Sequence, residues 1–282
     1  MKKIVIIPNN NKEAAFEIAE RIAAIISKNG AIAYVDEKYG ADYNKIAASY
    51  SEFPNDAELI IVVGGDGSVI DASLLAVKYD IPVLGVNLGN FGYLAEVEPS
   101  ELDSINKLFC GEYKIEEKML LCIKGAQGSE AEYGRFAVND IIISHESYLG
   151  ISEFTLVTDN NESVKYRSDG MILSTPAGST AYSLSAGGPI VDHGINAILA
   201  TPICPHSFFN RSIIFNENTK ITIKNTGKST LKISIDGRLV KNLDVGGECV
   251  IMQANKKLKM LAFSSNNMLA TLFAKMQKIE NI

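Results

Sequence analysis

Apolar residues in the first half of the chain follow two periods, and each period predicts one kind of element. Short β-branched runs predict buried strands at residues 3–8, 31–35, 59–63 and 81–86. Between these runs, apolar residues that recur every three or four positions predict helices that end near Gly30, span about 68–79 and begin near residue 99. Because strands that alternate with helices usually pair in parallel, residues 1–113 are expected to form an α/β domain around a parallel sheet.

The pattern changes near residue 113. Most later segments alternate apolar and polar positions or are rich in β-branched residues, so residues 114–263 are expected to form an all-β, mostly antiparallel domain. One helix, at about 179–186, interrupts the predicted strands. A last helical pattern, at about 267–278, has an apolar face, and residues 264–282 are therefore expected to pack back on the first domain.

Composition restricts where the protein works and what it binds. The chain has 282 residues, 46% of them hydrophobic, and no apolar run approaches the roughly 20 residues of a membrane span. It has no signal-peptide pattern and no basic tract, and its formal charge is −6, so we expect a cytoplasmic protein that binds neither membranes nor nucleic acid. The four scattered cysteines predict no disulfide framework, and Cys204 and His206 lack the further ligands of a metal site.

The third predicted strand runs directly into the glycine-rich segment Gly64, Gly65, Asp66, Gly67 and Ser68. Such a turn brings backbone N–H groups and a helix start close to a phosphate, because no side chain intervenes. A carboxylate beside a polyphosphate is unfavourable unless it binds a metal ion or removes a proton, so Asp66 indicates a phosphotransferase centre. A plain strand-to-helix turn with Asp66 as the N-cap is an equally weighted alternative on these residues alone.

A second glycine-rich segment, residues 85–94, follows the fourth predicted strand and ends in Tyr93 and Leu94. Because the carboxyl ends of parallel strands lie at one edge of a sheet, the two segments are expected to border one cleft. Other nucleotide motifs are absent from the chain, which has neither Gly-x-x-x-x-Gly-Lys-Ser/Thr nor Gly-x-Gly-x-x-Gly after a strand.

The longest stretch of small and polar residues lies in the second half, at 166–189. Gly178 and Ser179 predict a helix start whose N–H groups, together with the hydroxyls of Ser179 and Thr180, bind a sugar or phosphate oxygen. The ring of Tyr182 is suited to pack against a base or ribose, although taken alone it is more simply interpreted as a core residue.

Three linked segments resemble the NAD kinase family: Gly64-Gly65-Asp66-Gly67, Asn139-Asp140, and the run from Asp169-Gly170 through Thr175-Pro176-Ala177-Gly178-Ser179-Thr180-Ala181-Tyr182-Ser183-Leu184-Ser185. The resemblance covers about residues 58–240. It implies a Rossmann-like N-terminal domain, a β-sandwich C-terminal domain and a homo-oligomer, commonly a tetramer, with NAD held between domains. The implied activity is transfer of a phosphoryl group from ATP or polyphosphate, with Mg²⁺, to the adenosine 2′-hydroxyl of NAD, giving NADP.

The resemblance also implies roles for single residues. Asp66 matches the family's proton acceptor within the phosphate loop of Gly64, Gly65, Gly67 and Ser68. Asn139 and Asp140 match residues that contact the adenosine and ribose. The full set expected to bind NAD is Asp66, Gly67, Tyr93, Asn139, Asp140, Arg167, Asp169, Ala177, Thr180, Ala181, Tyr182, Ser183, Leu184 and Ser185.

Some positions depart from the family pattern, mainly on the phosphate-donor side. Arg238 stands where many members carry Gln, Gly150 where some carry a basic residue, and Asp71 where many carry Arg or Lys. Two other functions share part of the pattern. A lipid kinase of the diacylglycerol or sphingosine type has a Gly-Gly-Asp-Gly loop, but would not require Asn139-Asp140 or the polar run at 180–185, and a non-catalytic dinucleotide sensor would not require Asp66.

Overall fold

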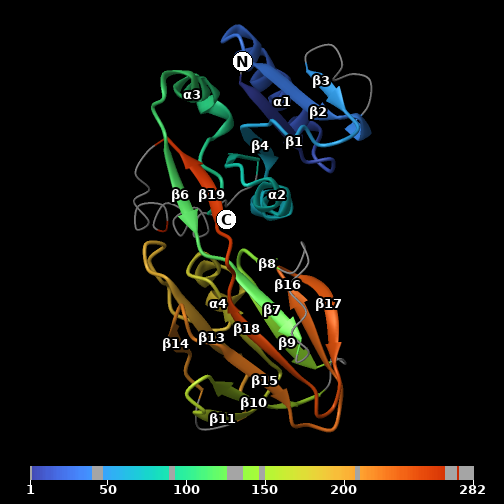
Figure 1. The fold of residues 1–282 in the computed structure, drawn as a ribbon, viewed down its shortest axis with the longest axis vertical. Coiled ribbons are helices and arrows are strands. Elements are labelled where there is room, and N and C mark those ends of the chain that lie inside the picture. Colours follow the sequence, from blue (N-terminus) through green and yellow to red (C-terminus); the bar gives the residue numbers. More distant parts are fainter. Residues whose placement is uncertain are drawn as a thin grey trace, which may run out of the picture. The chain divides into compact units, whose positions relative to one another are not determined.

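The computed structural model describes residues 2–39, 47–88, 93–125, 136–145, 150–206, 210–263 and Leu272 (Figure 1). The chain divides into two compact units, Met1–Glu117 with Leu258–Ile282, and Lys118–Lys257. The sequence assigned residues 114–263 to the second domain, whereas two strands from this range, β6 and β19, lie in the sheet of the first unit. The predicted helix at 267–278 falls outside the described residues, apart from Leu272.

The first unit is built on a seven-stranded sheet in the order β3-β2-β1-β4-β5-β19-β6, in which the pairs from β3 to β19 are parallel. Its strands are β1 Lys3–Pro8, β2 Ile32–Asp36, β3 Ala48–Tyr50, β4 Leu59–Gly64, β5 Val83–Asn87, β6 Lys114–Lys118 and β19 Leu258–Ala262. Its helices are α1 Glu13–Lys28, α2 Asp66–Tyr79 and α3 Lys107–Cys110, with 3₁₀ segments η1 Glu37–Tyr39 and η3 Pro99–Asn106. The expected parallel α/β architecture is therefore confirmed.

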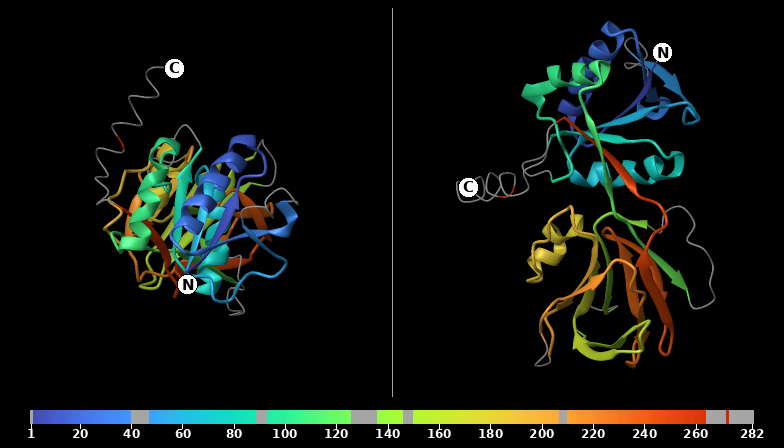
Figure 2. Two further views of the ribbon diagram at one scale, coloured as in Figure 1. Left: turned by 90° about the horizontal axis from the view of Figure 1, so that it is seen from above. Right: turned by 60° about the vertical axis from the view of Figure 1, so that its left-hand side comes forward.

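Helices cover both faces of this sheet because its central strands are apolar on both sides (Figure 2). Ile61 and Val63 of β4 pack in one cluster with the apolar face of α1, including Ile18 and Ile22. Side chains alternate along a strand, so the buried Ile60 and Val62 face the opposite side, and α2 packs against β4 and β5. The carboxyl ends of β1, β4 and β5 consequently lie together at one edge.

The second unit contains two six-stranded antiparallel sheets, in the orders β11-β10-β15-β18-β7-β8 and β14-β13-β12-β9-β16-β17. The strands of the first sheet are β7 Leu121–Gly125, β8 Phe136–Ala137, β10 Ser152–Thr158, β11 Ser163–Ser168, β15 Ile221–Asn225 and β18 Glu248–Gln253. Those of the second are β9 Asp140–His145, β12 Gly170–Ser174, β13 Ala197–Ile203, β14 Ile213–Asn216, β16 Leu231–Ile235 and β17 Arg238–Leu243.

Both sheets contribute side chains to one core, which makes this unit a β-sandwich, as expected. Leu156 and Ile223 of the first sheet belong to the same buried cluster as Ile143 and Leu173 of the second. The predicted helix at 179–186 is a 3₁₀ segment, η4 Ala177–Thr180, followed by the single turn α4 Tyr182–Ser185. In the part of the chain that the structure describes, no helix is long and apolar enough to cross a membrane.

Candidate functional site

The phosphate loop lies where β4 passes into α2. Strand β4 ends at Gly64, Gly65 is the N-cap, and α2 begins at Asp66, two residues earlier than the sequence pattern predicted. A Cβ atom at position 64 would lie 2.4 Å from the Oγ of Ser68, so the first turn of α2 folds tightly over a position that only glycine fits. The Ser68 hydroxyl in turn accepts a hydrogen bond from Asn9 Nδ2 at 2.8 Å, which ties the loop after β1 to the phosphate loop.

Asp66 connects the two glycine-rich segments. Its Oδ2 accepts the backbone N–H of Tyr93 at 2.7 Å, and its Oδ1 accepts that of Leu94 at 3.0 Å. The backbone N–H of Leu88, after β5, donates to the carbonyl of Gly64 at 2.9 Å. The two segments therefore meet at one edge of the sheet, although residues 89–92 lie outside the described part.

The interpretation of Asp66 as a simple N-cap is wrong. Asp66 is the first helical residue, and α2 has no side-chain capping hydrogen bond. Two backbone donors from the segment after β5 instead hold its carboxylate in one orientation. Burial raises the pKa of the Tyr93 phenol, and the nearby charge of Asp66 raises it further, so that ring stays protonated.

In the second unit, the turn between β16 and β17 holds the Asn139-Asp140 segment. Asp236 and Gly237 both have positive φ, 46° and 78°, as a tight hairpin turn requires. This geometry aims the Asp236 carboxylate at three backbone donors: Oδ2 accepts the N–H of Val138 at 2.8 Å, and Oδ1 accepts those of Asn139 and Asp140 at 2.8 and 3.1 Å. Asp236 was not among the predicted site residues, and its signal was the Asp-Gly pair at the end of a predicted strand.

The carboxyl of the buried Asp140 lies close enough to the half-buried Asp236 for the charge of one to act on the other. Burial raises the pKa of Asp140 to about 7, and the charge of Asp236 contributes to the rise. Burial also raises the pKa of Asp236, but its three backbone hydrogen bonds and the charge of Arg238 oppose that rise. Arg238, one of the departures from the family pattern, thus acts on the turn that holds Asn139.

The polar run at 166–189 meets Asn139 directly. The backbone N–H of Thr175 donates to the Asn139 carbonyl at 2.9 Å, and its hydroxyl donates to the Val138 carbonyl at 2.6 Å. A Cβ atom on Gly178 would lie 2.1 Å from the Asn139 carbonyl oxygen, so this approach requires glycine. The structure therefore brings together two of the three segments predicted from the sequence within the second unit.

Two serine hydroxyls of this run make hydrogen bonds inside the fold. The Ser179 hydroxyl is fully buried, donates to the Pro176 carbonyl at 2.7 Å and accepts the N–H of Val191 at 3.1 Å. The buried Ser183 hydroxyl pairs with Thr201 Oγ1 at 3.0 Å. These internal bonds use the hydroxyl groups to fix the loop, so the prediction that Ser179 binds a sugar or phosphate oxygen is wrong for its side chain.

The alternative interpretation of Tyr182 as a core residue is wrong. Its side chain is 45% exposed, and its neighbours Leu184 and Ser185 are exposed as well, while Ala181 and Thr180 are half-buried. The buried Ala177 lies beneath them in η4. The surface of this short helical segment consequently presents an aromatic ring and small side chains, a combination suited to a flat ligand.

Arg167 and Asp169 border the start of β12 and are both exposed. The Nε of Arg167 forms an ion pair with Glu153 at 3.0 Å, and such an exposed pair leaves the guanidinium accessible. The backbone N–H of Asp169 donates to the Ile203 carbonyl, and its carbonyl accepts from the His145 N–H and the Ser152 hydroxyl. These hydrogen bonds fix the backbone from which the Asp169 side chain extends. Gly150 packs against the His145 ring, since a Cβ atom there would approach the imidazole to 2.4 Å.

Within the described ranges, no group of three His, Cys, Asp or Glu side chains is arranged to hold a metal. The phosphate loop carries Asp66, and Asp71 follows on α2. Mg²⁺ is typically held by one or two such carboxylates together with substrate phosphates.

Comparison with known proteins identifies the family. The model of the ATP-NAD kinase N-terminal domain matches residues 4–113, and that of the ATP-NAD kinase C-terminal domain matches residues 138–263. The chain belongs to the NAD kinase family. It is therefore a phosphotransferase that acts on an alcohol group, and the lipid kinase alternative is not favoured.

Curated relatives named NAD kinase align with nearly the whole length of this chain. The NAD kinase of Natranaerobius thermophilus is 35% identical and covers 93% of both chains. That of Lachnoclostridium phytofermentans is 34% identical, covering 95% of this chain and 96% of the relative, and that of Caldanaerobacter subterraneus subsp. tengcongensis is 32% identical with the same coverage.

Two solved structures share the NAD kinase fold of this chain. The yeast NADH kinase complexed with NADH superposes with a TM-score of 0.81 at 24% identity, covering 97% of this chain and 86% of that one. The NAD kinase from Archaeoglobus fulgidus in complex with ATP superposes with a TM-score of 0.72 at 21% identity, covering 99% of each chain.

Proposed function

We propose that this NAD kinase transfers the terminal phosphoryl group of ATP to the adenosine 2′-hydroxyl of NAD, giving NADP, with Asp66 as the general base. The observation that carries the proposal is the position of the Asp66 carboxylate. It stands at the first residue of α2, inside the glycine loop, and two backbone donors from Tyr93 and Leu94 fix its orientation. Each oxygen keeps lone pairs that can accept the proton of a hydroxyl.

In the proposed reaction, the ribose 2′-hydroxyl attacks the terminal phosphorus in line with the leaving phosphate. Asp66 takes the hydroxyl proton as the new O–P bond forms, and the bond to the leaving group breaks. The backbone N–H groups at the start of α2, from Gly65 to Gly67, would stabilise charge on the transferred group. A Mg²⁺ ion bound with the donor would neutralise its phosphate charge.

On the acceptor side, we propose that Asn139 and Asp140 contact the adenosine and ribose of NAD. The exposed face formed by Asp169, Tyr182 and their neighbours would line the rest of the dinucleotide site. This part is supported by the contacts among Asp236, Asn139 and Gly178, which hold the segment rigidly. Rigid placement of the acceptor can contribute several kcal/mol to catalysis, roughly 7–11 at the limit.

The experiment that tests the acceptor compares NAD, its 2′-deoxyadenosine analogue, adenosine and dispersed diacylglycerol with ATP and Mg²⁺. We expect product at an appreciable rate only from NAD, because binding of the remote nicotinamide half helps to orient the adenosine half. Labelled phosphate on the deoxy analogue, or on the lipid at a comparable rate, would contradict the proposal.

We further propose that the enzyme is a cytoplasmic homotetramer. The family resemblance supports this assembly, and so does the exposure of Leu239, Val240 and Ile214 on β17 and β14, the two edge strands of one sheet. Sedimentation velocity at micromolar concentration should give a mass four times that of the 30.6 kDa chain. A single monomeric species would contradict this assembly.

A further inference from the structure

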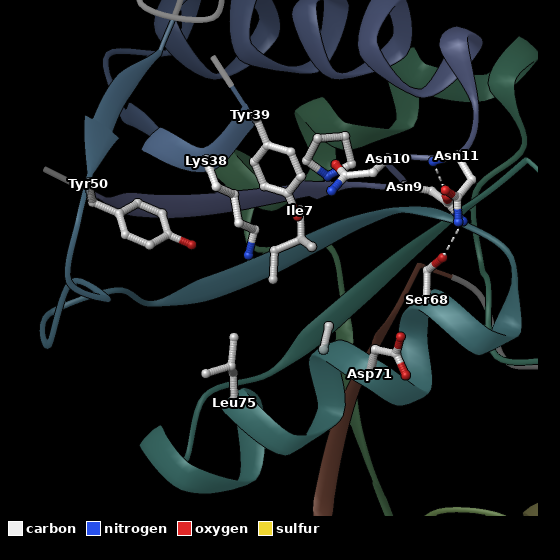
Figure 3. Close-up of a pocket in the computed structure, with 12 residues that line it drawn as sticks. Ile7, Asn9, Asn10, Asn11, Lys38, Tyr39, Tyr50, Ser68, Asp71 and Leu75 are labelled. Atoms are coloured by element: carbon white, nitrogen blue, oxygen red, sulfur yellow. Dashed lines mark hydrogen bonds between the residues drawn. The ribbon is translucent and has the colours of Figure 1, made fainter. Parts of the chain in front are cut away.

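The loop that connects β1 to α1 is fastened to the phosphate loop. The Asn9 side chain points to Ser68 and donates a hydrogen bond to its hydroxyl at 2.8 Å (Figure 3). The backbone N–H of Asn9 donates to the carbonyl of Val63, near the end of β4, at 2.9 Å. The Asn9 carbonyl in turn accepts the N–H of Lys12 at 3.1 Å. The backbone of Lys12 therefore has a fixed place beside the phosphate loop.

Lys12 is the N-cap of α1, a position that its side chain does not suit. N-cap residues are usually Ser, Thr, Asp or Asn, because their side-chain oxygen accepts a free N–H of the first helical turn. Lys12 makes no such bond, and a positive charge is unfavourable at the positive end of the helix dipole. A residue that breaks a local rule of stability is expected where a tertiary or functional contact compensates for the cost.

The Lys12 side chain makes its contact with the segment after β5. Its Nζ donates to the carbonyl of Leu88 at 2.6 Å, across 76 positions of the chain. The N–H of Leu88 donates to the carbonyl of Gly64 in the phosphate loop at 2.9 Å. Both backbone polar groups of Leu88 are therefore held. The bond from Lys12 is the stronger type, because its donor is charged and the side chain is half-buried.

Leu88 lies at the start of the segment that orients the Asp66 carboxylate. Later in this segment, the N–H groups of Tyr93 and Leu94 donate to the two oxygens of Asp66. The far end of the segment returns to β5, where Val97 pairs with the strand. The donors to Asp66 thus lie between two anchors, and Lys12 supplies part of the first one.

We propose that Lys12 is a positioning residue for catalysis, which holds the Leu88 carbonyl and thereby keeps the segment after β5 where its N–H donors orient the Asp66 carboxylate. The inference rests on the function proposed above, in which Asp66 is the base. Misplacement of a catalytic group by about 1 Å can cost on the order of 100-fold in rate. Loss of Lys12 should therefore act on kcat, while the surfaces that bind the two substrates stay in place.

Steady-state kinetics of two variants at this position tests the inference. Lys12→Met removes the donor and keeps most of the side-chain length, whereas Lys12→Arg keeps a charged donor. Lys28→Met, at an exposed position in the last turn of α1, is the control for the loss of one positive charge from this helix. We expect Lys12→Met to lower kcat at least about tenfold, with KM for NAD and for ATP within about twofold of the parent values. Lys12→Arg should recover most of the loss, and Lys28→Met should behave like the parent.

Hydrogen–deuterium exchange measures the positioning without turnover. The backbone N–H groups of Leu88, Tyr93 and Leu94 are each protected by a hydrogen bond of this network. In Lys12→Met they should exchange at least about fivefold faster, because the first anchor is weakened. Peptides from α1 and β4 should keep the parent rates, and Lys12→Arg should exchange like the parent.

The outcomes separate this inference from the proposed function. If the parent enzyme makes no NADP from NAD and ATP, the proposed function fails, and the exchange rates still decide whether Lys12 holds the segment. With an active parent, three results would overturn the inference: a folded Lys12→Met variant that keeps the parent kcat, one that changes only KM for ATP, or unchanged exchange of the three N–H groups. Circular dichroism and the thermal midpoint establish that the variant is folded.

Discussion

The carboxylate of Asp236 accepts the backbone N–H of Asn139 at 2.8 Å, across 97 positions of the chain. The same carboxylate also accepts the N–H groups of Val138 and Asp140, and the Asp236 N–H donates to the Asp140 carbonyl at 3.0 Å. A hairpin turn of the sandwich thus determines where the predicted adenosine-binding pair stands. Asp236 is a positioning residue, because it acts on Asn139 and Asp140 through their backbone.

Asp236→Asn should raise KM for NAD by about tenfold or more and leave KM for ATP unchanged. Asn tolerates the positive φ of the turn, but its amide replaces one of the two accepting oxygens, so at least one N–H loses its partner. Steady-state kinetics with each substrate varied in turn measures the effect. Asp159→Asn, at an exposed turn position, is the control for charge loss. Equal changes in both KM values would instead indicate a general loss of structure.

Asp66→Asn should lower kcat by at least about 100-fold, because it removes the base and keeps the side-chain shape. The amide satisfies only one of the two N–H groups of Tyr93 and Leu94, so we also expect the free energy of unfolding to fall by about 1–3 kcal/mol. Rapid-quench or coupled assays give kcat, and urea unfolding gives stability. Asp103→Asn, at an exposed position, is the control for the loss of one negative charge. Near-normal turnover in Asp66→Asn would exclude the role of Asp66 as the base.

The buried Asp140 should make stability depend on pH in an unusual direction. Its pKa is about 7 in the folded chain and near 3.8 when exposed, so the folded state binds the proton more tightly. The contribution of Asp140 to the free energy of unfolding is therefore complete below about pH 4 and is lost as pH rises through 7. Asp140→Asn cannot ionise, so its free energy of unfolding relative to the parent should rise by about 1–3 kcal/mol from pH 5 to pH 8. Urea titrations at both pH values test this, and a constant difference would contradict the assigned protonation.

Tyr182→Ala should raise KM for NAD severalfold at little cost in stability. The ring is 45% exposed, and removing such a surface side chain usually changes the free energy of unfolding by under about 0.5 kcal/mol. The buried Tyr166, by contrast, stacks on Phe154 at 5.6 Å between centroids, and Tyr166→Ala should destabilise by about 3–5 kcal/mol. Ile195→Ala is an exposed control in the same unit. A Tyr182→Ala variant with parent KM values would remove this ring from the proposed site.

The sequence alone determined the central strands of the first sheet, but not the order in which they pair. The predicted strand at residues 3–8 is the observed β1, and the run at 59–63 lacks only Gly64 of β4. These runs are buried on both faces, so their apolar pattern depends little on the rest of the fold. Short or polar edge strands were not predicted, among them β3 with its exposed Ala48 and Ser49 and β17 with five exposed positions. These segments form strands because they hydrogen-bond to a neighbouring strand, β2 for β3 and β16 for β17, and not because their own residues favour a strand.

The residue types of the site were also determined by the sequence, since glycines, a carboxylate and a polar run are local signals. Only the tertiary structure decided what each side chain does. It holds Asp66 by backbone donors of the segment after β5, keeps Tyr182 exposed, and engages the Ser179 hydroxyl internally. Asp236 becomes part of the site through a turn that is distant in sequence. Hydrogen bonds and burial depend on which segments meet, and contacts between segments distant in sequence are specified by the packing of whole sheets, which no local pattern encodes.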